Sequence, residues 1–116
     1  MFKLKRVYEA PSPDDGERVL VDRLWPRGMT KAKAAVDLWM KEISPSTELR
    51  KWFDHDPAKW AGFQARYREE LETRPTLTDE LREKARQGTV TLLYGARNQA
   101  QNEAAALKAF LEASSG

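Results

Sequence analysis

The chain has 116 residues, of which 41% are hydrophobic and 33% are charged, and its formal net charge is +2. These values are typical of one soluble globular domain spanning residues 1–116, and they exclude a disordered chain. The absence of cysteine excludes disulfides, zinc ribbons and a thiol nucleophile, and the single histidine, His55, argues against a protein-only transition-metal site, so we expect no metal and no cofactor.

The first segments indicate two strands. Residues 2–8 alternate apolar and basic side chains, which predicts a half-buried strand. Residues 12–16 predict a single helical turn that Ser12 caps and Gly16 ends. Residues 18–24 predict the second strand. The link between the two strands is short, so we expect them to pair as an antiparallel hairpin.

Helical patterns follow from about residue 31. One stripe carries Ala34 and Leu38, and the chain restarts at residues 44–46, where Ser44 or Ser46 can cap a short helix. Asp56 followed by Pro57 is a clear signal for a helix start, and apolar residues recur at helical spacing up to residue 71.

The last third predicts helix, strand and helix. Residues 76–88 form a helix in which Thr76 and Asp79 resemble a capping box. Residues 89–96 are apolar nearly throughout, which predicts a central strand covered on both faces. No apolar run approaches the length of a membrane span and no signal core is present, so we expect a cytoplasmic protein with no membrane partner. Asn98 then caps a final helix, and residues 113–116 fray.

Strands separated by helices are most simply parallel, so the ends of the second and the last strand share one edge of the sheet. Ligands of open α/β sheets bind at that edge, and the amino end of the final helix points there too. Six residues are therefore predicted to line a polar crevice: Asp22, Arg23, Arg27, Tyr94, Arg97 and Asn98.

Each of these residues also has a structural interpretation. Arg23 and Arg27 either form an anion site or pin the loop through an internal ion pair, for example with Asp22. Trp25 at a strand end is more often a packing plug than a ligand platform. Asp22 is the best candidate for a general acid or base, because an acid at the end of a buried strand can have a shifted pKa. Tyr94 either presents its hydroxyl to a ligand or bonds within the core.

The blocks "RVLVDRLWPRG", "SPSTELRKWF" and "VTLLYGA", the last followed by Asn102, resemble the YeaO-like branch of the domain-of-unknown-function family number 488 over nearly the whole chain. The broader family has a strand that ends in an Asp-Val-Arg-type motif, and here "VDRLWPRG" takes that place. The resemblance implies a small α/β domain and parallel first strands, against the hairpin. Cysteine and histidine chemistry of the broader family does not carry over, because "YGARNQAQNEA" lacks those residues.

Together these observations predict a single α/β domain with a short parallel or mixed three-stranded sheet and helices around it. The leading hypothesis is a crevice that binds a small anion, such as a nucleotide or phosphorylated metabolite, with an enzymatic step left open. Its expected ligand-binding residues are Arg23, Trp25, Arg27, Tyr94, Arg97, Asn98 and Asn102, and its expected catalytic residue is Asp22. The alternatives are a nucleic-acid-binding module and a protein-interaction domain. Nothing in the sequence indicates an oligomeric state.

Overall fold

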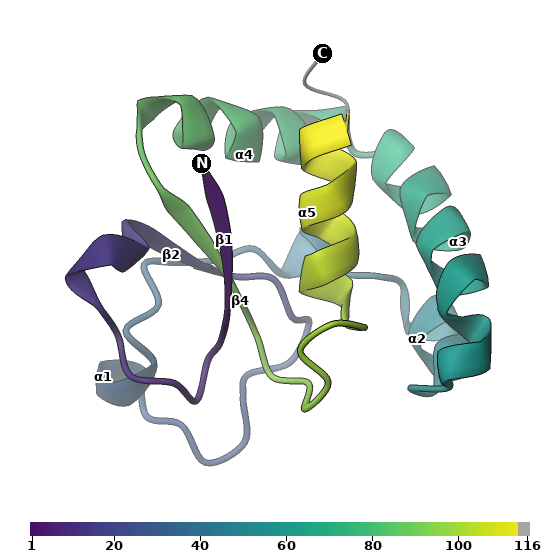
Figure 1. Cartoon of the computed structure of the whole chain (residues 1–116), viewed down its shortest axis with the longest axis horizontal. Coiled ribbons are helices and arrows are strands. Elements are labelled where there is room, and N and C mark those ends of the chain that lie inside the picture. The colour runs from purple at the N-terminus through teal and green to yellow at the C-terminus, as the bar shows by residue number, and fades with distance from the viewer. Residues whose placement is uncertain (114–116) are drawn as a thin grey trace.

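The computed structural model describes residues 1–113 and centres on a four-stranded sheet in the order β1-β4-β2-β3 (Figure 1). All three strand pairs are parallel. The strands are β1 (Phe2–Arg6), β2 (Glu17–Leu20), β3 (Leu38–Trp39) and β4 (Val90–Tyr94). The fold is thus an α/β fold with a parallel sheet, as the sequence predicts. The part of the chain described here contains no helix that is both long and apolar enough to cross a membrane.

The predicted hairpin is wrong, because β1 and β2 do not pair with each other. Both pair with β4, which lies between them and is buried along its whole length. The physical reason is burial: the most apolar strand takes the centre, and the half-polar β1 and β2 lie on either side of it. The sheet also gains a fourth strand, since Leu38 pairs with Val19 although the 34–39 stripe predicts helix.

Alternate residues of β4 pack against different cores, as the two-residue period of a strand requires. Val90, Leu92 and Tyr94 belong to the larger core cluster, which the long helices complete. Leu93 points to the other face and joins a smaller cluster with Leu20 and the half-buried ring of Trp39. One face of the sheet is therefore covered by helices and the other mainly by the segment between β2 and β3.

The helices are α1 (Lys31–Ala34), α2 (Thr47–Phe53), α3 (Trp60–Glu72), α4 (Pro75–Gln87) and α5 (Glu103–Ala113). Asp56 caps the turn that leads into α3, as predicted, and Ser46 rather than Ser44 caps α2. The Thr76–Asp79 capping box is not formed, because α4 already begins at Pro75 and its N-cap residue makes no side-chain bond. Ala113 is helical, and the other residues predicted to fray, 114–116, lie outside the described part of the chain.

The start of α5 also differs from its prediction. Asn98 accepts bonds from the amides of Ala100 and Gln101 in a local turn, and the chain makes a further turn before the helix. The cap is Asn102, whose Oδ1 accepts from the Ala105 amide at 2.8 Å. Both asparagines suit a cap, and the tertiary packing of α5 selects the second one.

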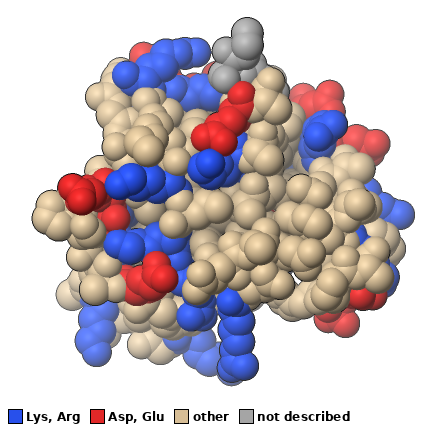
Figure 2. Space-filling model, viewed as in Figure 1, with Lys and Arg blue, Asp and Glu red and all other residues tan. Residues whose placement is uncertain are grey.

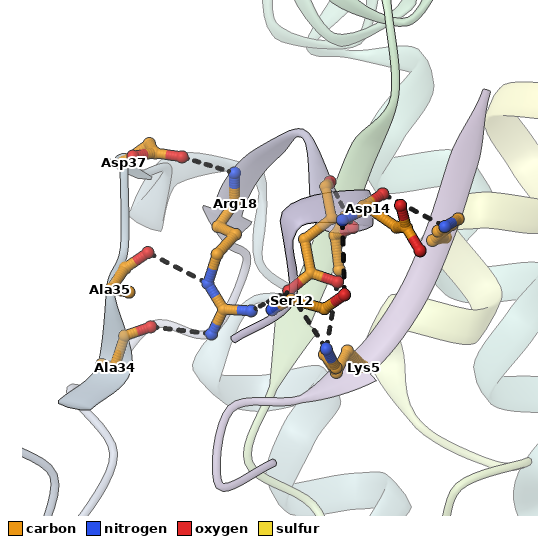
Figure 3. Close-up of polar contacts among 10 residues, drawn as sticks. Lys5, Ser12, Asp14, Arg18, Ala34, Ala35 and Asp37 are labelled. Carbon is orange, nitrogen blue, oxygen red and sulfur yellow. Dashed lines mark hydrogen bonds and ion pairs between the residues drawn. The ribbon is translucent and has the colours of Figure 1, made fainter. Parts of the chain in front are cut away.

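A buried ionic cluster joins the amino end of β2 to Lys5, near the carboxyl end of β1, and to the segment before β3 (Figure 3). Asp15 accepts from Lys5 at 3.0 Å and from Arg18, and the Arg18 guanidinium also donates to the carbonyls of Ala34 and Ala35. Burial opposes ionisation of Asp15, but bonds from the Ser12 amide and the two cations outweigh it and hold the Asp15 pKa below its ordinary value. This cluster holds the first strands and the β2–β3 segment together.

Candidate functional site

The carboxyl ends of β2 and β4 meet, as the parallel sheet predicts. The amide of Gly95, directly after β4, donates to Asp22 Oδ2 at 2.8 Å. The Trp39 indole N–H donates to the Asp22 carbonyl at 2.7 Å. Asp22 is therefore fixed through both its side chain and its backbone, and the two loops that follow the strands lie side by side.

A pocket of about 470 Å³ opens next to this junction. Its size falls within the range of small-molecule sites. One wall is the strand end from Asp22 to Pro26, and Phe53 and Phe63, stacked at 4.4 Å, form an apolar part of the wall. The start of α5 contributes Asn102 and Glu103. The pocket thus combines an apolar surface with polar groups from three separate segments.

One face of α2 forms a further wall of the pocket. Thr47, Arg50, Lys51 and Asp54 all line it, and their spacing of three and four residues places them along the same side of the helix. Asp54 and His55 follow α2 with φ angles of 46° and 54°. Aspartate and histidine tolerate this left-handed backbone better than most residues, and it turns the end of the helix around the pocket.

Asp22 has an unusual electrostatic environment. Burial raises its pKa to about 6, although the Gly95 amide and the charge of Arg50 both lower it. Its Oδ1 is buried and accepts no hydrogen bond from any described residue. The carboxyl group is thus held at one oxygen only, and it titrates near neutral pH.

Arg23 does not form the internal ion pair that the structural interpretation offers. Within residues 1–113 its guanidinium makes one contact, from Nη2 to the Ser44 carbonyl at 3.4 Å, and its Nε is buried without an acceptor. The buried arginine that forms an ion pair is Arg18, and its partner is Asp15. Arg23 therefore retains several unused N–H donors on the pocket wall.

The structure brings some of the predicted site residues to the pocket. Asp22, Arg23, Trp25 and Asn102 line it. Trp25 also packs edge-on against Trp39 at 5.4 Å and donates to the Met29 carbonyl, so it has the structural role as well. Asn102 is buried, and both ends of its amide are engaged in holding the start of α5.

The other predicted residues lie elsewhere. Tyr94 is 3% exposed within the larger core, and burial raises its pKa. Arg27 and Arg97 are exposed and do not line the pocket, and Asn98 forms its local turn outside it. The ligand-binding roles of these residues remain predictions.

The sequence prediction missed four charged residues of the pocket: Arg50, Lys51, Asp54 and Glu103. The spacing of 47, 50, 51 and 54 was a usable signal, because it gathers polar residues on one side of a short helix. The packing of α2 against α3 brings this side of α2 next to the segment that follows β2. In the described part of the chain, no group of three or more His, Asp or Glu residues is arranged to hold a metal ion.

The chain is similar to a known protein family and to uncharacterized bacterial proteins. A family model described as "Inactive DUF488-N3 subclade" matches residues 1–115. The uncharacterized protein YeaO of Escherichia coli K12 is 45% identical over 110 residues, which cover 95% of this chain and 96% of that protein. The uncharacterized protein Rv3073c of Mycobacterium tuberculosis H37Rv is 43% identical over 109 residues, covering 94% and 92%. No solved structure matches the chain.

Proposed function

This chain belongs to the inactive subclade of the DUF488-N3 family, and from that premise we propose that it binds a small anionic ligand in the pocket beside Asp22 rather than transforming one. The word "inactive" in the family description argues against a catalytic step, and the argument for binding rests on the pocket itself. The expected catalytic role of Asp22 accordingly gives way to a role in contacting the ligand.

One observation carries the proposal. Arg23, Arg50 and Lys51 reach the same pocket from the β2 end and from α2, and none of them forms an ion pair with residues 1–113. Arginine and lysine donors are the groups that bind phosphates and carboxylates in proteins. Seven ion pairs elsewhere in the described chain engage other cations, so the free ones at the pocket remain available to an anion.

The proposal places the anion at Arg23 and Arg50 and not at Arg27, which the sequence favoured. Arg50 lies near enough to Asp22 to lower the pKa of that carboxyl, so its charge acts inside the pocket. Arg27 is exposed and does not line the pocket. Glu103 at the amino end of α5 repels an anion from that helix end, which leaves the two arginines as the preferred position.

The surface charge favours a small ligand over a nucleic acid. On the face shown in Figure 2, most Lys and Arg side chains lie beside Asp or Glu side chains, and a group along the lower edge of the view is separated by uncharged residues. Nucleic-acid binding needs a basic stripe that follows the backbone phosphates. This face has no such stripe.

The test is calorimetric titration of the protein with inorganic phosphate, ethyl phosphate and mononucleotides at low and moderate salt. Arg50→Gln should weaken binding at least about tenfold, the usual loss for one charged hydrogen bond. Arg68→Gln is the matched control, since Arg68 is an exposed arginine of α3 away from the pocket.

Arg27→Ala distinguishes the two placements of the anion, because only a site at Arg27 would lose affinity in that variant. Binding that appears only with oligonucleotides and disappears in salt would favour the nucleic-acid alternative. No binding of any anion would refute the proposal.

A further inference from the structure

The pocket carries acids as well as cations. Asp22, Asp54 and Glu103 line it together with the three cations Arg23, Arg50 and Lys51. Above the pKa of Asp22 the acids and the cations balance, so the pocket as a whole offers no excess of positive charge. The arginines attract a ligand that carries only negative charge, and the carboxylates repel it.

None of these three acids is neutralised by the protein itself. No described residue forms an ion pair with Asp22, Asp54 or Glu103, although acids elsewhere in residues 1–113 do pair. Glu103 is half-buried and makes no side-chain hydrogen bond within the described chain. Asp22 Oδ1 is the carboxylate oxygen that protein donors leave unbonded. Buried acceptors of this kind are costly unless a donor satisfies them.

The Arg23 side chain has the complementary feature, an N–H donor without an acceptor among the described residues. Arg23 Nε is buried and has no partner among residues 1–113, and within that range the one hydrogen bond of this guanidinium is the long one to the Ser44 carbonyl. Asp22 and Arg23 are neighbours in the chain, yet they do not form an ion pair with each other. Asp22 Oδ1 and Arg23 Nε are therefore a buried acceptor and a buried donor that no described residue satisfies, in two residues that line the same pocket.

We propose that the ligand is amphoteric: it carries a phosphate or carboxylate that Arg23 and Arg50 bind, and an amino or other N–H donor group that Asp22 and Glu103 accept from. This inference rests on the proposed function and adds the second half of the ligand. The donor group satisfies the carboxylates that a plain anion would meet unpaired. The stacked rings of Phe53 and Phe63 then contact the apolar part of the ligand between its two polar ends.

Two pairs of probes isolate the donor group. Phosphoethanolamine and ethyl phosphate share a phosphate monoester, but only the first carries an ammonium group. CMP and UMP share a nucleotide frame; CMP has an exocyclic amino donor beside an acceptor ring nitrogen, whereas UMP has a ring N–H donor between two carbonyl acceptors, so this pair tests the amino group in particular. Calorimetry at pH 7.5 should show at least about a tenfold preference for the amino-bearing member of one pair. The first pair supports a small zwitterion and the second a nucleotide.

Variants assign the preference to the acids. Asp22→Asn or Glu103→Gln should reduce the preference severalfold and leave ethyl phosphate binding equal or tighter, since a carboxylate that repels the anion is gone. Glu48→Gln is the matched control: Glu48 also lies in the first turn of a helix, is exposed, and does not line the pocket. Arg50→Gln should weaken both members of a pair alike.

The outcomes separate the two proposals. If all phosphates bind equally well, or if the preference survives in both acid variants, the amphoteric ligand is refuted while the anion site stands. If Asp22→Asn and Glu103→Gln abolish the preference, the inference holds. If no phosphate compound binds at all, the anion site and the amphoteric ligand fall together.

Discussion

Replacing Asp22 by asparagine should stabilise the protein at neutral pH. The carboxyl of Asp22 has a pKa of about 6 in the folded protein because it is buried, against an ordinary value of 3.8. A shift of about two pKa units corresponds to about 3 kcal/mol of free energy, which is the upper estimate of the cost of holding this carboxylate ionised in the fold. Asparagine carries no charge and keeps an oxygen that accepts from the Gly95 amide.

The pH dependence follows from the sign of the shift. Because the folded-state pKa is raised, the folded protein keeps the proton of Asp22 at pH values where the unfolded chain has lost it. The free energy of unfolding therefore falls as the pH rises from about 4 to about 6 and then levels off. Asp22→Asn should match the wild type near pH 4 and be more stable by about 2–3 kcal/mol at pH 8.

The measurement is urea unfolding followed by tryptophan fluorescence at several pH values between 4 and 8. Thermal unfolding gives a second readout, in which a difference of this size raises the Tm by roughly 8–12 °C. Asp14→Asn is the control, because Asp14 is exposed and its carboxylate takes part in none of the ion pairs of the described residues. A variant that is no more stable than the wild type at pH 8, or a difference that does not vary with pH, would refute the reasoning.

Three further changes test the fold. Asp15→Ala should lower the free energy of unfolding by about 3–5 kcal/mol in urea titrations, since it leaves the buried Arg18 without its counter-ion; a loss below 1 kcal/mol would contradict this role. Gly16→Ala should cost roughly 2–4 kcal/mol, because φ is 62° there and a Cβ would lie 2.2 Å from the Thr89 carbonyl oxygen; an unchanged Tm would be inconsistent with that contact. Tyr67→Phe should cost about 1–2 kcal/mol by removing a buried 2.6 Å hydrogen bond to a backbone carbonyl, and equal stability would show that the bond contributes nothing.

Local signals in the sequence predict local structure well here. The turn between Ser12 and Gly16 is formed as predicted, with Ser12 accepting at its start. Asp56 and Pro57 begin a helical segment, and Gly88 ends one. These outcomes depend on groups within four residues of one another, so the sequence alone contains the necessary information. The apolar run of β4 is a similar case, because only a central position buries all of it.

The candidate site was predicted in part. Asp22 could be placed at a strand end, next to the segment after β4, because parallel strands carry their carboxyl ends to one edge. The contributions of Arg50 and Glu103 were not predictable in the same way. Their places on the pocket wall depend on how α2 and α5 pack, which is decided by contacts between distant residues.

The sequence by itself determined the class of fold, the position of the central strand and some helix ends, such as the start at Asp56 and the stop at Gly88, since each depends on composition, periodicity or neighbouring residues. Only the tertiary structure decided that β1 and β2 lie on opposite sides of β4, that Leu38 and Trp39 form a strand, and that Arg18 rather than Arg23 takes the buried ion pair. Several strands and several charged residues of similar local chemistry could have paired with one another. Long-range packing decides which of them do, because it determines which partners come within bonding distance.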